Sequence, residues 1–126
     1  MTGRGRPRTR FIDHVGRKIL LIDFSGIEDA QTALDAISEA RAVVAAQPAD
    51  GSLLTLTSVD GAYFDSGVLK AIRELAEHNR PYVRAGAVVG LTGLMKVVYN
   101  TLVHLTGRNI KPFESLEAAK TFLVAQ

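Results

Sequence analysis

The residues most suggestive of chemistry are Asp65, Ser66 and Gly67, in the stretch AYFDSGVLKAI. Apolar positions at helical spacing follow them, so they stand where a helix begins. An aspartate or serine at a helix start caps the helix by accepting a hydrogen bond from a free backbone N–H group. The same N–H groups and the positive end of the helix dipole also tolerate a phosphate on Ser66. These residues therefore fit both a helix cap and a phosphorylation site, and their spacing favours the cap.

Further small and hydroxyl-bearing residues follow the other predicted strands. In open α/β sheets, ligands and reactive groups collect beyond the carboxyl ends of the strands. We therefore predict a partner-binding or ligand-binding rim made of Ser25, Ser58, Asp60, Asp65, Ser66, Gly67, Gly90, Thr92 and Gly93. A phosphate on Ser66 would add about two negative charges to this rim, beside Asp65 and Asp60. Such a charge would change the surface that a partner meets and leave the fold in place.

The sequence lacks the motifs of common enzymes and cofactor sites. It has no cysteine, which excludes disulfides and thiolate chemistry. Its histidines, His14, His78 and His104, lack the spacing of metal ligands. Phe64–Val68 does not match the G-x-S-x-G nucleophile elbow, and Gly90–Lys96 does not match a phosphate-binding loop. We therefore expect no enzymatic activity, no metal and no cofactor. We interpret Gly90 and Gly93 as residues that permit a tight turn and close packing.

The N-terminal segment differs in composition from the rest of the chain. The net charge of the whole chain is +2, but residues 1–10 contain no acidic residue and four arginines, Arg4, Arg6, Arg8 and Arg10. We predict a disordered basic tail over residues 1–10 and one domain over residues 11–126. Gly3–Arg8 resembles an AT-hook, a minor-groove binding motif. A single copy in a tail is better explained as a solvated basic terminus, so nucleic acid is not the expected partner.

No apolar run approaches the ~18 residues that a transmembrane helix requires. The arginine-rich start is not followed by the apolar core of a secretory signal. We therefore expect a cytoplasmic protein.

Apolar periodicity predicts that strands and helices alternate along the chain. Two β-like runs around Gly16 predict a hairpin, and Ile19–Phe24 is its more buried strand. The other predicted strands are Ser52–Ser58, Val83–Val89 and Ile110–Phe113; the predicted helices cover residues 28–46, the segment from Asp65 or Ser66 to just before Asn79, the segment from Thr92 to Gly107, and the segment that Ser115–Glu117 opens. Helices between strands connect parallel strands. The expected fold is therefore α/β, with a mixed, largely parallel sheet of four to five strands and about four helices.

The predicted helix from Thr92 has more apolar side chains than one sheet face can cover. A stripe between Leu91 and Leu105 already supplies a complete buried face. The additional apolar surface fits a second core contact, a homodimer interface, a membrane-surface contact or one wall of a hydrophobic pocket. The candidate residues for a hydrophobic ligand or a dimer contact are Met95, Val97, Val98, Tyr99, Leu102 and Val103.

Four segments carry a resemblance to a known family: SLLTLTSV, AYFDSGVLKAI, YVRAGAVVGLTGLMKVV and LTGRNIKPFESLEAAKTFL. From about Phe11 to the C-terminus the chain resembles the STAS domain family, in particular its SpoIIAA-like branch, named after a sporulation anti-anti-sigma factor. In STAS proteins, partner kinases phosphorylate the serine that follows the aspartate in a D-S-x-G-L-like turn, and Asp65 and Ser66 match this pair. The sequence departs from the pattern because one residue is missing before Gly67 and Val68 precedes Leu69.

The resemblance implies a STAS-type α/β fold and a non-enzymatic regulatory module. It implies a protein partner, such as an anti-sigma-factor-like kinase, and a switch by phosphorylation at Ser66. The segment GAVVGLTGLMK is similar to the CRAL-TRIO-related branch, which implies an alternative function as a carrier or sensor of a lipid or other hydrophobic small molecule. A homodimer is compatible with either function.

Overall fold

The computed structural model describes residues 7–93, 96, 99–100 and 110–126. In this part of the chain the elements are β1 (Thr9–His14), β2 (Arg17–Asp23), α1 (Ala30–Ala45), β3 (Leu53–Ser58), α2 (Ser66–Asn79), β4 (Val83–Val89), β5 (Ile110–Phe113) and α4 (Leu116–Val124). The predicted helix from Thr92 to Gly107 lies mostly outside the described residues. Three helices of the predicted four are therefore described.

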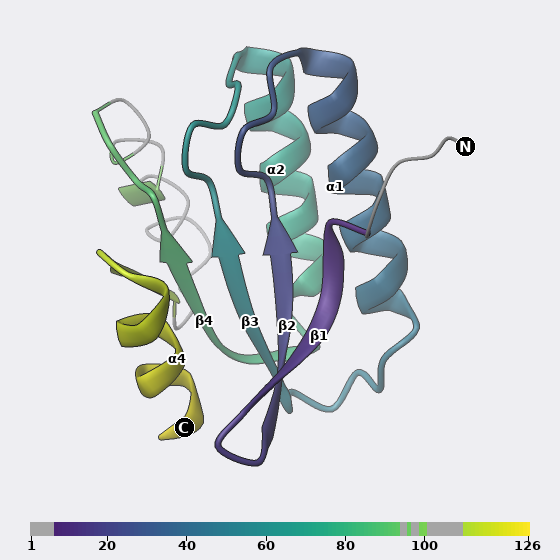
Figure 1. Ribbon diagram of the computed structural model, residues 1–126. Coiled ribbons are helices and arrows are strands. Elements are labelled where there is room, and N and C mark those ends of the chain that lie inside the picture. Colours follow the sequence, from purple (N-terminus) through teal and green to yellow (C-terminus); the bar gives the residue numbers. More distant parts are fainter. Residues whose placement is uncertain (1–6, 94–95, 97–98, 101–109) are drawn as a thin grey trace.

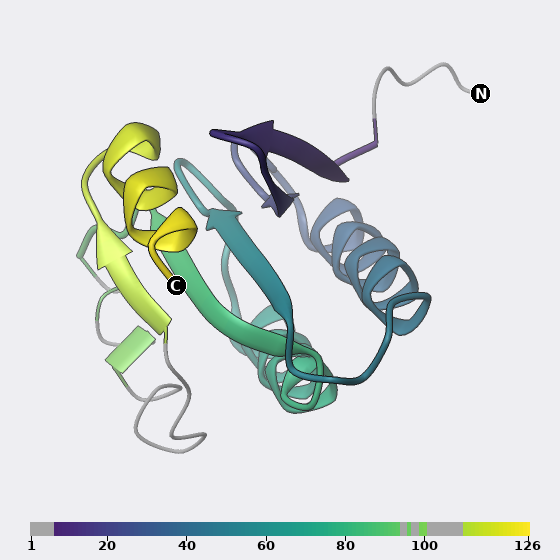
Figure 2. The same cartoon turned by 90° about the horizontal axis from the view of Figure 1, so that it is seen from below.

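The strands form one five-stranded sheet in the order β1-β2-β3-β4-β5. β1 pairs with β2 antiparallel, and all other neighbours pair parallel. The prediction of a mixed, largely parallel α/β sheet is confirmed. α1 and α2 pack side by side on one face of this sheet, and α4 covers the opposite face (Figures 1 and 2).

The β1–β2 hairpin is confirmed, and its turn lies at Val15 and Gly16. Both residues have positive φ angles, 50° and 77°, as the mirror-image turns of tight hairpins require. Thr9 pairs with Ile22, so the sheet begins before residue 11, the predicted start of the domain.

The predicted tail boundary at residue 10 is wrong by two residues, because Thr9 and Arg10 belong to β1. The backbone N–H of Thr9 also donates to Glu39 Oε2 on α1, at 2.8 Å. Just before the strand, the Arg8 guanidinium donates to the carbonyl oxygens of Asp23 and Ser25. Residues 1–6 of the predicted tail lie outside the described residues.

Each face of the sheet has its own apolar core. Leu20 and Ile22 of β2 pack on the face that α1 and α2 cover, whereas Ile19 packs on the α4 face. Ile19 and Leu20 are both 0 % exposed. The central strands are thus buried on both sides, as is usual for parallel strands in α/β proteins. This rigid, two-sided core fixes where the strands end and hence where the loops that follow them lie.

Candidate functional site

The carboxyl ends of β2, β3 and β4 meet at one edge of the sheet, at the top of Figure 1. Backbone hydrogen bonds join the loops there: Val59 N–H donates to the Val89 carbonyl at 3.0 Å, and Gly26 N–H donates to the Asp60 carbonyl at 3.0 Å. The structure thus brings together the predicted residues Ser25, Ser58, Asp60 and Gly90. We call this edge, together with the start of α2, the rim.

Gly90 permits the closest contact at the rim. Its φ angle is +89°, and a Cβ atom at this position would lie 2.5 Å from the backbone nitrogen of Asp60. Glycine alone tolerates both the angle and the contact. The interpretation of Gly90 as a residue for a tight turn and close packing is therefore confirmed. Thr92 and Gly93 follow as exposed residues.

The hydroxyl of Ser25 is engaged within its own loop. Its Oγ donates to Asp23 Oδ1 at 2.5 Å, and its backbone N–H donates to the same oxygen at 2.9 Å. Ser58 is half-buried at the end of β3, whereas Asp60 is exposed. Of the predicted hydroxyl residues on these loops, neither Ser25 nor Ser58 offers a fully exposed side chain.

Asp65 is the N-terminal cap of α2, so the predicted cap is confirmed. Its extended backbone precedes the helix, and its Oδ1 accepts the backbone N–H of Val68 at 2.8 Å. Ser66 is the first residue of α2, and both Ser66 and Gly67 are exposed. The capping bond comes from Asp65, so the hydroxyl of Ser66 is not required to start the helix.

The second oxygen of Asp65 accepts a hydrogen bond that the sequence analysis missed. Tyr63 Oη donates to Asp65 Oδ2 at 2.8 Å. The N–H of Val68, and then the Tyr63 hydroxyl, hold the pKa of Asp65 below its ordinary value, because both bonds favour the ionised carboxylate. These bonds require the ionised carboxylate. They therefore stabilise the fold fully above the ordinary pKa of aspartate, and this stabilisation is lost as pH falls through the lowered pKa of Asp65.

The same hydrogen bond raises the pKa of Tyr63. The bond to Asp65 is the largest cause, desolvation is the second, and the negative charges of Asp65 and Asp29 add to it. Each of these effects favours the neutral phenol over the phenolate. A tyrosine two residues before a helix-capping aspartate is the only signal in the sequence that could have indicated this pair.

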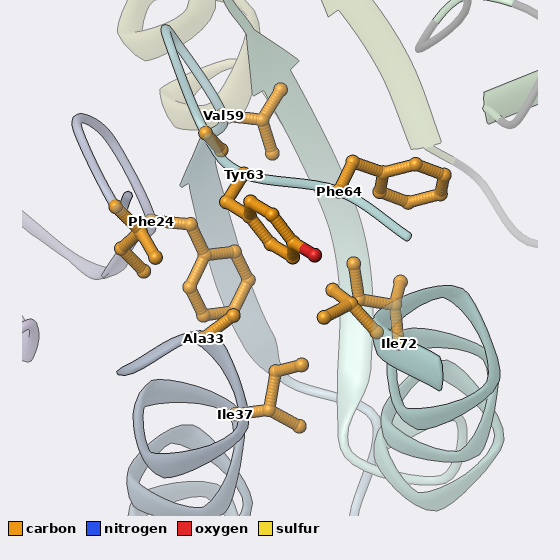
Figure 3. A pocket seen from close by; sticks show the side chains of 10 residues that line it. Phe24, Ala33, Ile37, Val59, Tyr63, Phe64 and Ile72 are labelled. Carbon is orange, nitrogen blue, oxygen red and sulfur yellow. The ribbon is translucent and has the colours of Figure 1, made fainter. Parts of the chain in front are cut away.

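Tyr63 also lines a small apolar cavity between α1, α2 and the end of β2. Figure 3 shows its ring among the side chains that form the walls, with the hydroxyl as the polar atom. The lining residues are Phe24, Ile27, Ala33, Ile37, Val59, Ala62, Tyr63, Phe64, Val68 and Ile72. The cavity has a volume of about 10 Å³, which is the least that a single water molecule requires.

The hydrophobic residues predicted to contact a ligand or a second subunit fall mostly outside the described part of the chain. Met95, Val97, Val98, Leu102 and Val103 lie there. Tyr99 is described: it is half-buried, and its hydroxyl donates to the carbonyl oxygen of Ile110 at the start of β5. Desolvation raises the pKa of Tyr99. This hydrogen bond links Tyr99 to β5, an edge strand of the sheet.

Replacing Gly90 tests the close approach at the rim. Gly90→Ala should lower the free energy of unfolding by about 2 to 6 kcal/mol, because it combines a forbidden backbone angle with a backbone clash. Gly51→Ala is the matched control: Gly51 has a φ angle of +69° but no atom within 4 Å of its would-be Cβ, so about 1 to 2 kcal/mol is expected. Urea unfolding measures both, and equal losses would contradict the contact.

Replacing the Asp65 carboxylate tests the hydrogen bond to Tyr63. Asp65→Asn should lower the pKa of Tyr63 toward the ordinary tyrosine value, because the negative charge is lost and an amide oxygen accepts more weakly. Asp60→Asn, which changes another rim carboxylate, should leave this pKa in place. An NMR titration of the Tyr63 ring carbon that bears the hydroxyl reports the value. An unchanged midpoint in Asp65→Asn would show that the bond does not form in solution.

In the described residues, no group of three or more His, Asp or Glu side chains is arranged to hold a metal ion. None of the described helices is both long and apolar enough to cross a membrane. In comparisons with known proteins, the sequence matches no protein-family model and no curated protein.

Proposed function

We propose that this chain is a non-enzymatic regulatory module of the STAS, SpoIIAA-like type, whose rim binds a protein partner under the control of phosphorylation at Ser66. The observation that carries the proposal is the position of Ser66, an exposed hydroxyl residue at the start of α2 beside its capping aspartate. The match of Asp65 and Ser66 to the STAS phosphorylation turn, and the mixed sheet that precedes it, support this function.

Asp65 and Ser66 have different roles at the start of α2, which supports a signalling role for Ser66. Asp65 supplies the cap of α2, so the hydroxyl of Ser66 is not needed to start the helix and is free to carry a phosphate. The free N–H groups and the dipole at a helix N-terminus tolerate that added charge. The modification thus adds negative charge to the surface at the start of α2.

The charge of the rim indicates what kind of partner would respond. Glu28, Asp29 and Asp60 are exposed on the loops that meet there, so the rim is acidic before any modification. A phosphate would add about two further negative charges. A partner with basic side chains would bind more tightly after phosphorylation, and a partner with acidic side chains would be released.

The two histidines in the described part of the chain, His14 and His78, lie away from the rim. His14 ends β1, which runs antiparallel to β2, and His78 lies in the last turn of α2. Both therefore lie at the end of the molecule opposite the rim. Within the described residues, Ser66 has no histidine nearby of the kind that activates the serine of a hydrolase.

Phosphorylation at Ser66 is directly testable. We expect mass spectrometry of the protein from its native host to find phosphate on Ser66 in at least one growth state. The full chain with phosphoserine at position 66 should then bind its partner with an affinity changed at least tenfold, because two charges are added at the contact. Ser66→Ala should abolish the modification, whereas Ser38→Ala, at another exposed serine on α1, should not. An unmodified Ser66 in every growth state would contradict the proposal.

The apolar cavity supports a second candidate function, that of a carrier or sensor of a hydrophobic small molecule. Its walls are apolar except for the Tyr63 hydroxyl, which is already bonded to Asp65. A ligand there would be held by apolar contacts alone. The small volume means that the walls would have to separate to admit one.

Native mass spectrometry tests this second candidate. After gentle purification, a carrier should show additional bound mass. Ala33→Leu fills the cavity and should remove that mass, whereas Ala42→Leu, on the exposed side of α1, should retain it. A wild-type protein that shows only the mass of its own chain would count against a carrier.

A further inference from the structure

The Asp65 carboxylate makes two bonds of different kinds. One oxygen accepts the backbone N–H of Val68 and so holds the start of α2, while the other accepts the hydroxyl of Tyr63. A single carboxylate therefore joins a helix end to a side chain in the cavity wall. Moving that carboxylate would disturb both contacts together.

The segment that carries Tyr63 forms one wall of the cavity. We call residues 59–65 the β3–α2 loop; four of them, Val59, Ala62, Tyr63 and Phe64, line the cavity (Figure 3). Backbone bonds also hold the loop, among them Tyr63 N–H to the Ile27 carbonyl at 2.8 Å and Ala62 N–H to the Val59 carbonyl at 3.1 Å. The bond between the Tyr63 and Asp65 side chains adds the link to α2.

We infer that Asp65 couples the phosphorylation state of Ser66 to the β3–α2 loop. A phosphate on Ser66 displaces the Asp65 carboxylate from the start of α2, Tyr63 loses its acceptor, and the loop loosens over the cavity. This inference rests on the proposed function, because it requires that Ser66 be phosphorylated. It adds a change of shape to the change of charge.

Competition for the same N–H groups gives the physical reason. A phosphate has three strong acceptor oxygens and about two negative charges, and it would stand one residue, ~3.8 Å along the backbone, from Asp65. It can therefore accept the N–H groups at the start of α2 that Asp65 now accepts. It also repels the carboxylate, which further favours the movement of Asp65 away from the helix.

The covalent step is an ordinary phosphoryl transfer. The bond between Ser66 Oγ and the γ-phosphorus of a nucleoside triphosphate forms, and the bond to the β-phosphate oxygen breaks. The nucleoside diphosphate leaves, and the hydroxyl proton is released. The partner kinase supplies the nucleotide and the catalytic groups, so the step requires nothing further from this chain.

Amide hydrogen exchange of the full chain tests the inference without any partner. Phosphoserine is placed at position 66 during synthesis, and exchange is followed by NMR. The Tyr63 and Ala62 amides should exchange about tenfold faster than in the unmodified chain, because a hydrogen bond to a charged group is lost. Amides of β4, which lies in the central sheet, should change less than twofold.

Tyr63→Phe supplies the matched variant, because it removes only the hydroxyl. Its β3–α2 loop should exchange faster even without phosphate, and phosphoserine should then add less than a twofold change. Three results would overturn the inference: unchanged exchange in the phosphorylated wild type, an equal rise across β4, or a full tenfold rise in Tyr63→Phe. The unmodified wild type and the β4 amides verify that each protein is folded.

The two proposals fail in different ways. If the inference is wrong, phosphoserine at position 66 can still change partner affinity while the loop amides keep their exchange rates. If the proposed function is wrong, Ser66 is unmodified in the host, or its phosphorylation leaves the affinity for the partner unchanged. Either result can occur even if phosphoserine placed at position 66 in vitro loosens the loop.

Discussion

The parallel pairing of β2, β3 and β4 is the constraint on which the rest of the structure depends. It places the ends of three strands side by side, so that the loops after them must share one edge of the sheet. The contact between Gly90 and the backbone of Asp60 shows how little space is left between these loops. Because the strands are buried on both faces, their ends cannot shift independently. The ends of these strands therefore form a rigid base for the loops of the rim.

The Asp65 carboxylate makes two hydrogen bonds that shift pKa values at the rim. The carboxylate accepts a backbone N–H of α2 and the hydroxyl of Tyr63, and these two bonds explain why its pKa is lowered and that of Tyr63 is raised. One charged group thus serves the helix, the loop and the wall of the cavity. Ser66, beside it, is left exposed. The cap and the proposed phosphorylation site can therefore be adjacent residues, because only Asp65 is needed to start α2.

Local sequence signals were sufficient for most of the fold. β4 and β5 have the predicted bounds; in β4, an apolar and β-branched run that ends at Gly90 identifies the strand directly. The cap at Asp65 follows from the same kind of local rule. The start of β1 could not be predicted from a local signal. Thr9 and Arg10 are polar, and only their pairing with β2 and the bond from Thr9 to Glu39 make them part of the sheet. The Tyr63–Asp65 bond and the cavity were also missed, because they depend on how side chains turn after the loop is folded.

The relation between the rim and the cavity helps to rank the two candidate functions. The β3–α2 loop belongs to both, since it leads into the cap of α2 and forms a wall of the cavity. A ligand larger than water can enter only if the cavity walls separate, whereas a protein partner can reach the exposed Ser66 and Asp60 with no movement at all. Partner binding therefore has no free-energy cost for a conformational change, whereas ligand binding must include the free-energy cost of opening the cavity. For this reason we favour the proposed regulatory module over the proposed carrier.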